Sequence, residues 1–317
     1  MSKRITIITP VFNEAAGLER YEREVTRTLL ASQNFEFDVL FVDDGSADGS
    51  WEAIAAICAR NPRFTGVRLS RNYGAHVALS AGFSHAGGDA VATLACDLQD
   101  PPETVLEFAR RWKDGAQIVW GHRRSRDDGT RRSLASSMFE TLIRRFAMPR
   151  GSKFATGSFL LVDRLVADAF RQFQEHNRVT FALVAWTGFR QEIVEYDRVR
   201  RQTGASGWTW RRMVKTMYDV FIGFSFVPIR LMTLSGLLLA ALTVPILIYL
   251  GYIYLTGVPL AGWTSVMAAL TLFFGVQFLL LGIVGEYLYR IYAEVVRRPL
   301  YFVSDRTANA PDAVRAR

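Results

Sequence analysis

The feature that most constrains this chain is a run of 55 consecutive residues, Leu231 to Gly285, that contains no Asp, Glu, Lys or Arg. A helix needs about 20 apolar residues to cross the hydrocarbon core of a bilayer. The run can therefore hold two membrane helices, which we expect at about 231–255 and 263–287, separated by a turn at Gly257–Gly262. The sequence thus predicts a helical hairpin that spans a membrane.

Arginines flank this run on both outer sides, while the predicted turn carries no charge. Arg230 precedes the first helix, and Arg290, Arg297 and Arg298 follow the second. Because basic flanks stay on the cytoplasmic side, we expect a multi-pass protein of the inner (cytoplasmic) membrane with both termini in the cytoplasm. The formal net charge of +8 suits the anionic cytoplasmic leaflet. Nucleic acid is the rival partner, but no aromatic-basic RNA-binding motif supports it.

The N-terminal end and the cysteines agree with a cytoplasmic domain. MSKR leads straight into ITIITPVF, a strand pattern without the cleavage site of a secretory signal. Cys58 and Cys96 form no close-spaced motif, so we read them as reduced thiols.

The first half of the chain alternates between continuous apolar strands and helices. This alternation predicts an α/β domain whose mostly parallel sheet is covered on both faces. We expect strands at 5–11, 37–42, 67–69, 90–95, 118–120 and 157–162, and helices at 15–32, 50–60, 77–86 and 103–113.

Three polar loops follow the ends of predicted strands. They contain Asn13 and Glu14, the segment Asp43–Ser46, and the segment Asp97–Asp100. Ligands of open α/β sheets bind beyond the carboxyl ends of the strands, so these loops form the candidate site. Two of them also have a plainer reading: an Asx turn for Asp43–Ser46, and a polar turn stopped by two prolines for Asp97–Asp100.

Basic and amphipathic stretches suggest further contacts. The basic run at 121–132 follows a strand, and Arg123 and Arg131 are our candidates for binding phosphate, although such a run is usually a solvated loop. The segment 208–226 mixes aromatic and basic residues and reads as an interfacial helix region, or as a helix packed on the soluble domain. The end of the chain, 307–317, reads as a disordered tail. His76 and His122 lack a partner at zinc-ligand spacing.

Several motifs together resemble a known group. TPVFNE, VDDGS, DLQDPPE and GEYLYRIYAEVVRRPLYFV occur in this order, and the resemblance extends from about Ile5 to Val303. They are similar to the polyprenyl-phosphate glycosyltransferases of family 2, such as dolichol-phosphate mannose synthases, bactoprenol glucosyltransferases and undecaprenyl-phosphate aminoarabinose transferases. The resemblance implies a cytoplasmic GT-A (Rossmann-like) catalytic domain at 1–206, amphipathic interfacial helices at 207–229, two transmembrane helices within 230–290, and a cytoplasmic C-terminal segment at 291–317.

The same resemblance implies an inverting transfer of a sugar from a nucleotide-diphosphate sugar, with UDP as the preferred nucleotide, to a polyprenyl phosphate. A Mg²⁺ or Mn²⁺ ion would be the cofactor, and a homo-oligomer through the membrane and juxtamembrane helices is compatible with the pattern. The implied site residues are Pro10, Phe12, Glu14, Asp43 and Asp44 for the donor nucleotide, Asp97 and Gln99 for the metal, Asp97, Arg123 and Arg131 for catalysis, and Arg131, Arg201 and Ser158 for the acceptor phosphate.

Three positions depart from the pattern of the group. Ala95 stands where many members have the first Asp of Asp-x-Asp, and Ser158 stands where many have an acidic residue. Trp208 ends a Gly-Ala-Ser-Gly-Trp segment that lacks a common lysine. The departures keep two alternatives open: a non-catalytic scaffold that binds nucleotide-sugar or lipid, and a processive polysaccharide synthase, which would need more membrane helices than two.

Overall fold

The computed structural model describes residues 3–124, 159–176, 178–198 and 262–313, with single positions between 231 and 256. The chain divides into two compact units, one of Met1–Val220 with Pro299–Arg317 and one of Phe221–Arg298. The last part of the chain therefore belongs to the same unit as the N-terminal half. The predicted interfacial segment 207–229 lies outside the described residues.

The N-terminal unit is built on an eight-stranded sheet in its described part, with the order β7-β5-β6-β4-β1-β2-β3-β8. Neighbours pair in parallel except for β6, which is antiparallel to β4 and β5, and β8, which is antiparallel to β3. The prediction of an α/β domain with a mostly parallel sheet is confirmed. The strands are β1 Arg4–Val11, β2 Glu36–Asp43, β3 Phe64–Leu69, β4 Ala90–Thr93, β5 Ile118–Arg123, β6 Leu160–Asp163, β7 Gln191–Tyr196 and β8 Val303–Arg306.

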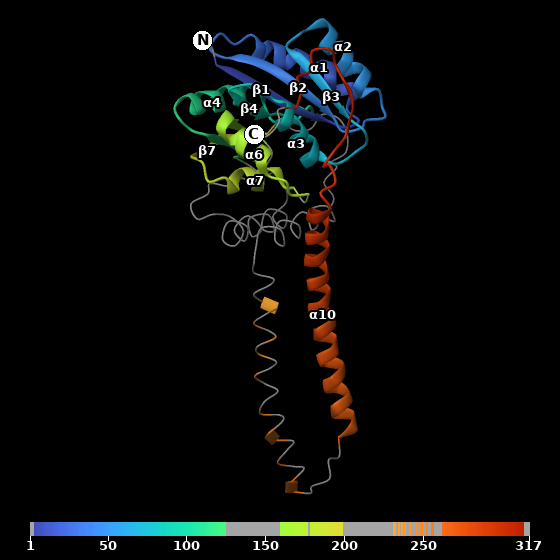
Figure 1. Ribbon diagram of the computed structural model, residues 1–317. Coiled ribbons are helices and arrows are strands. Elements are labelled where there is room, and N and C mark those ends of the chain that lie inside the picture. Colours follow the sequence, from blue (N-terminus) through green and yellow to red (C-terminus); the bar gives the residue numbers. More distant parts are fainter. Residues whose placement is uncertain are drawn as a thin grey trace. The chain divides into compact units, whose positions relative to one another are not determined.

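Helices cover both faces of this sheet (Figure 1). Alternate residues of the central strand β1 point to opposite sides, as a pleated strand requires. Ile5 and Ile7 join the core beneath α1, α2 and α4, whereas Ile8 lies so close to Gly82 of α3 that a Cβ there would come within 2.3 Å of it. The helices of this unit are α1 Ala15–Val25, α2 Ser50–Arg60, α3 Ala75–His85, α4 Pro102–Lys113, α6 Arg164–Gln172 and α7 Thr180–Trp186.

Most predicted elements differ from the observed ones by a few residues at one or both ends, and two of these differences have a clear local cause. The helix expected at 15–32 ends as an α-helix at Val25 and continues as a π-helical turn, η1 Thr26–Leu30. The Thr28 hydroxyl donates to the Glu24 carbonyl at 2.6 Å, a local bond that competes with helix hydrogen bonding. Strand β4 stops at Thr93 rather than at residue 95, because the chain turns into the loop that contains Leu98, whose φ is 52°.

The second unit contains α10, Trp263–Val296. Within the described residues, one helical stretch is long and apolar enough to cross a membrane, Phe273–Val296. The helix begins where the second membrane helix was expected but continues beyond residue 287 to Val296. The positions described between 231 and 256 are helical, and the rest of the first predicted membrane helix lies outside the described residues. The described residues thus show one long apolar helix, and the hairpin stays a prediction.

Strand β8 was not anticipated from the sequence. It follows α10 after six residues, 297–302, and joins the edge of the sheet beside β3. Thr307, expected to begin a disordered tail, instead donates its backbone N–H to the Gly66 carbonyl at 3.0 Å and accepts the Gly66 N–H on its hydroxyl at 2.9 Å. The expectation of a disordered tail was therefore wrong at Thr307. This residue extends the pairing between β8 and β3, and no local sequence pattern indicates that pairing.

Candidate active site

The loops that follow β1 and β2 are bonded to each other at the carboxyl end of the sheet. Asn13 adopts a left-handed conformation with φ of 54°. Its backbone N–H donates to the Ser46 hydroxyl and its side-chain oxygen accepts the Ala47 N–H, both at 2.9 Å. The Glu14 N–H donates to the Ser50 hydroxyl at 3.0 Å. The two loops therefore form one rigid edge, with Phe12 45% exposed beside it.

The two aspartates of the DDGS loop are buried and already have partners in the protein. Asp43 is fully buried; its Oδ1 accepts the Ser46 N–H at 3.1 Å, and its Oδ2 lies 3.2 Å from Nε of Arg68. Asp44 accepts the N–H groups of Tyr73 and Gly74 on its two oxygens, each at 2.8 Å. Burial raises the pKa of the Asp44 carboxyl, and these amide bonds partly offset the rise.

Asp44 thereby fixes the loop between β3 and α3 against the loop after β2. Gly45 has a φ of 71°, and a Cβ at this position would lie 2.4 Å from the backbone carbon of Arg71. The left-handed conformation and the missing side chain are both needed for the two loops to meet.

Replacing Gly45 with alanine is therefore expected to destabilise the protein. Backbone strain of this kind costs about 1–3 kcal/mol, before the contact with Arg71 is relieved. The melting temperature, followed by tryptophan fluorescence in detergent, should fall by several degrees, since each kcal/mol corresponds to about 2–4 °C in a domain of this size. Gly17→Ala is the matched control, because that helical position has nothing within 4 Å. An unchanged melting temperature in Gly45→Ala would contradict the contact.

The loop after β4 holds Asp97 and Gln99 in a strained turn. Leu98 between them has a φ of 52°, unusual for a branched side chain. Oδ1 of Asp97 accepts the Gln99 N–H at 3.2 Å, and both side chains are partly exposed. Within the described part of the chain, no hydrogen bond or ion pair engages Oδ2 of Asp97 or the Gln99 side-chain oxygen. Neither does any group of three or more His, Cys, Asp or Glu residues with metal-binding geometry occur there.

Asp100 in the same loop belongs to a cluster that sequence reasoning did not find. Its Oδ1 accepts the hydroxyl of Tyr196 at 2.6 Å and lies 3.4 Å from Nε of Arg198. Burial and the adjacent carboxylate raise the pKa of Tyr196, so the phenol stays protonated and donates. The nearby guanidinium of Arg123, at the end of β5, partly offsets this rise in the pKa of Tyr196. The cluster thus joins the Asp97 loop to the ends of β5 and β7.

The structure therefore describes most of the predicted site residues and brings them to one edge. Arg131, Arg201 and Ser158 lie outside the described residues. His76, at the start of α3, contacts Phe181 and accepts the Thr180 N–H on Nδ1 at 3.4 Å. Burial lowers the pKa of His76 to about 4, so it is neutral at physiological pH and serves to pack α3 on α7.

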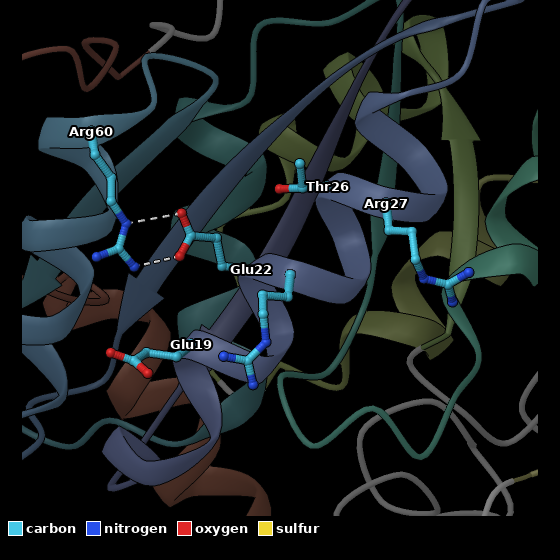
Figure 2. A pocket seen from close by; sticks show the side chains of 6 residues that line it. Glu19, Glu22, Thr26, Arg27 and Arg60 are labelled. Atoms are coloured by element: carbon cyan, nitrogen blue, oxygen red, sulfur yellow. Dashed lines mark hydrogen bonds and ion pairs between the residues drawn. The ribbon is translucent and has the colours of Figure 1, made fainter.

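A pocket of about 520 Å³ lies elsewhere, on the outer side of α1, η1 and α2 (Figure 2). The Glu22 carboxylate and the Arg60 guanidinium form an ion pair in its lining, and Arg27 points away from this pair and donates to Glu24 at 2.8 Å. None of the predicted site residues lines it. Its lining residues are Glu19, Glu22, Arg23, Thr26, Arg27 and Arg60. We therefore place the candidate site at the carboxyl edge of the sheet and not in this pocket.

Comparison with known proteins gives a consistent result. The family model described as glycosyl transferase family 2 matches residues 6–171. An uncharacterised glycosyltransferase from Synechocystis is 35% identical over 313 residues, covering 96% of each chain. A prophage-derived bactoprenol glucosyl transferase from Shigella flexneri is 30% identical, over 95% of this chain and 97% of that protein. A solved mannosyltransferase from Pyrobaculum calidifontis, in complex with GDP-mannose and Mn²⁺, is 19% identical with a TM-score of 0.48, over 70% of this chain and 64% of that one.

Proposed function

The chain belongs to glycosyltransferase family 2, and from this premise we propose that it transfers a sugar from a nucleotide-diphosphate sugar to a polyprenyl phosphate at the cytoplasmic face of the membrane. The observation that carries the proposal is the similarity to the Shigella bactoprenol glucosyl transferase, which extends over almost the whole of both chains. The long apolar helix α10 provides a means of reaching a lipid acceptor.

The polar edge at the carboxyl ends of β1, β2 and β4 is the proposed donor site. Pro10, Phe12 and Glu14 would contact the nucleoside, with the DDGS aspartates behind them. Because Asp43 and Asp44 are buried and bonded within the protein, we propose that they hold the shape of this pocket as well as bordering the nucleoside.

The residues present fit a divalent cation. Mg²⁺ and Mn²⁺ prefer oxygen ligands, and Asp97 and Gln99 supply two unengaged oxygens from a single turn. When bound, such an ion would neutralise charge on the donor diphosphate. Ala95 supplies no third oxygen, so waters and the diphosphate itself would have to complete the coordination.

The acceptor needs no general base. The second pKa of a phosphate monoester is about 6, so a lipid phosphate is largely dianionic at neutral pH. Its oxygen attacks the anomeric carbon, the bond from that carbon to the diphosphate oxygen breaks, and the nucleoside diphosphate departs with the electron pair. Configuration inverts, and no proton has to move. Ser158 in place of an acidic residue is compatible with this chemistry.

The protein must instead offset the repulsion between two anions. Cationic side chains at the site would lower this cost through charge-assisted hydrogen bonds to phosphate oxygens. Arg123 ends β5 beside the Tyr196 phenol, and we propose that its guanidinium binds a phosphate there. We propose the same task for Arg131 and Arg201.

The proposal is tested with the purified full-length protein in detergent, a polyprenyl phosphate, Mg²⁺ or Mn²⁺, and a panel of UDP- and GDP-sugars. We expect one donor to give a lipid-phosphate sugar detectable by mass spectrometry. The matched control is the corresponding polyprenol, which lacks the phosphate and should not be glycosylated, because its hydroxyl would need a base. Absence of product with every donor would overturn the proposal, and donor binding without turnover would favour the non-catalytic scaffold.

A further inference from the structure

The C-terminal strand β8 pairs with β3, at the edge of the sheet, on both sides of one shift in register. It runs antiparallel to β3, with Arg68 opposite Asp305 and Leu69 opposite Val303. Beyond the strand, the Ser70 N–H donates to the Phe302 carbonyl at 2.9 Å, and Thr307 exchanges bonds with Gly66. Ser70 begins the loop whose amides Asp44 binds, so β8 borders that loop directly.

A chain of side-chain contacts leads from β8 to the buried aspartate of the DDGS loop. Oδ2 of Asp305 accepts the indole N–H of Trp51 at 3.1 Å. The Arg68 guanidinium lies over the Trp51 ring, 5.9 Å from its centroid. Nε of Arg68 is 3.2 Å from Oδ2 of Asp43, and its Nη2 donates to the Ser46 carbonyl at 3.0 Å.

Each contact in this chain restrains the next group. Trp51 is 7% exposed, so its N–H depends on a protein acceptor, and Asp305 supplies it. A fixed indole gives Arg68 a surface to lie on, and Arg68 then neutralises the fully buried carboxylate of Asp43. A carboxylate without exposure to water needs such a partner if the loop is to keep one conformation.

We infer that β8 is a positioning element of the donor site, with Asp305 acting through Trp51 and Arg68 on the DDGS loop. The inference rests on the proposed function, because it assigns the consequence to nucleotide-sugar binding. Residues 297–302 are all that separate β8 from α10 in the chain. The donor half of the site is therefore tied covalently, through a short segment, to the membrane helix.

The first test is Asp305→Ala in the full-length protein. Without the carboxylate, Trp51 and then Arg68 lose their restraint, and the dissociation constant for the donor should rise about tenfold, the size expected for one buried hydrogen bond. Because the effect falls on ground-state binding, KM should rise similarly while kcat stays within about twofold. Asp305→Asn keeps an oxygen acceptor for the indole and should restore donor affinity.

Trp51→Phe is a second, independent test, because it keeps an aromatic ring under Arg68 but removes the indole N–H that Asp305 accepts. It should reproduce the effect of Asp305→Ala, and the double variant should be no worse than either single one, as expected for residues acting through one contact. It also serves if Asp305→Ala fails to fold. Asp312→Ala is the matched control on the same segment. The Asp312 side chain is 99% exposed and bonds only to Arg306 among the described residues. This variant should bind the donor with the affinity of the parent protein.

Binding is measured calorimetrically with UDP-glucose and with GDP-mannose, each with Mn²⁺, and melting temperatures are recorded in parallel. Wild-type protein that binds neither probe would count against the proposed function itself. Wild-type protein that binds, with Asp305→Ala and Trp51→Phe binding equally well, would overturn the inference alone. A lower melting temperature with unchanged donor affinity would likewise reduce β8 to a structural role and overturn it.

Discussion

Replacing Asp97 with asparagine is expected to lower kcat/KM for sugar transfer by about 10²- to 10³-fold, the range found when one preorganised electrostatic group is removed from an active site. The protein should remain folded. The one hydrogen bond that Asp97 makes within the described residues is accepted by Oδ1 from the Gln99 N–H, and an asparagine side-chain oxygen can accept it equally. What the variant loses is the negative charge proposed to hold a cation on the donor diphosphate.

The control for this variant is Glu103→Gln, six residues further along the chain and directly after Pro101 and Pro102. Glu103 has a side chain 57% exposed and lies 3.5 Å from Arg27 on the outer side of the domain. Its neutralisation should leave activity within about twofold, because exposed ion pairs contribute little. Initial rates at saturating lipid phosphate and variable donor give the comparison. Retention of more than a tenth of the parental kcat/KM in Asp97→Asn would refute a direct part for this carboxylate.

Much of the fold could be predicted because its signals are local. Continuous apolar strands alternating with helices are enough to indicate a mostly parallel sheet, and the helix at Ser50–Arg60 was expected within the bounds that the structure has. The same reasoning located the site edge, since parallel strands deliver the residues that follow them to one side of a sheet. Asp44, Asp97 and Asp100 reach that edge without any further information.

The parts that escaped prediction depend on contacts between distant residues. Val303–Arg306 has only four residues and no clear alternation, and it becomes a strand because the edge of β3 is available to pair with it. Tyr196 meets Asp100 across 96 positions of sequence. Residues so far apart in the sequence give no local signal that they will be in contact. Neither the β3–β8 pairing nor the Tyr196 cluster could therefore be predicted from the sequence pattern.

The DDGS loop shows a different limit. Two adjacent aspartates at a strand end indicate a polar site. The sequence does not indicate which carboxylate faces a ligand and which one bonds within the protein. Here the oxygens of Asp44 bind the Tyr73 and Gly74 amides, and Asp43 is paired with Arg68. Burial and hydrogen-bond partners are three-dimensional facts, so the roles of these residues toward the donor stay predictions.

Metal binding should depend strongly on the nucleotide. With one unengaged carboxylate oxygen on Asp97 and one amide oxygen on Gln99, the free protein offers too few ligands for tight binding of a hard cation. The diphosphate of the donor supplies the missing oxygens. We expect Mn²⁺ to raise the affinity for the nucleoside diphosphate of the preferred donor by about 5- to 150-fold, the usual range of coupling between two ligands.

This coupling is best measured from the nucleotide side, because UDP and GDP bind Mn²⁺ in solution and would confuse a direct metal titration. Calorimetry with and without saturating Mn²⁺ gives the ratio of dissociation constants, and linkage makes that ratio equal for the two ligands. In Asp97→Asn, the ratio of the dissociation constants without and with Mn²⁺ should fall close to the value expected if Mn²⁺ contacts only the nucleotide. Glu103→Gln should keep the ratio of the parent protein. Tight Mn²⁺ binding by the free protein, unaffected by Asp97→Asn, would place the metal on other ligands and so contradict the assignment of Asp97.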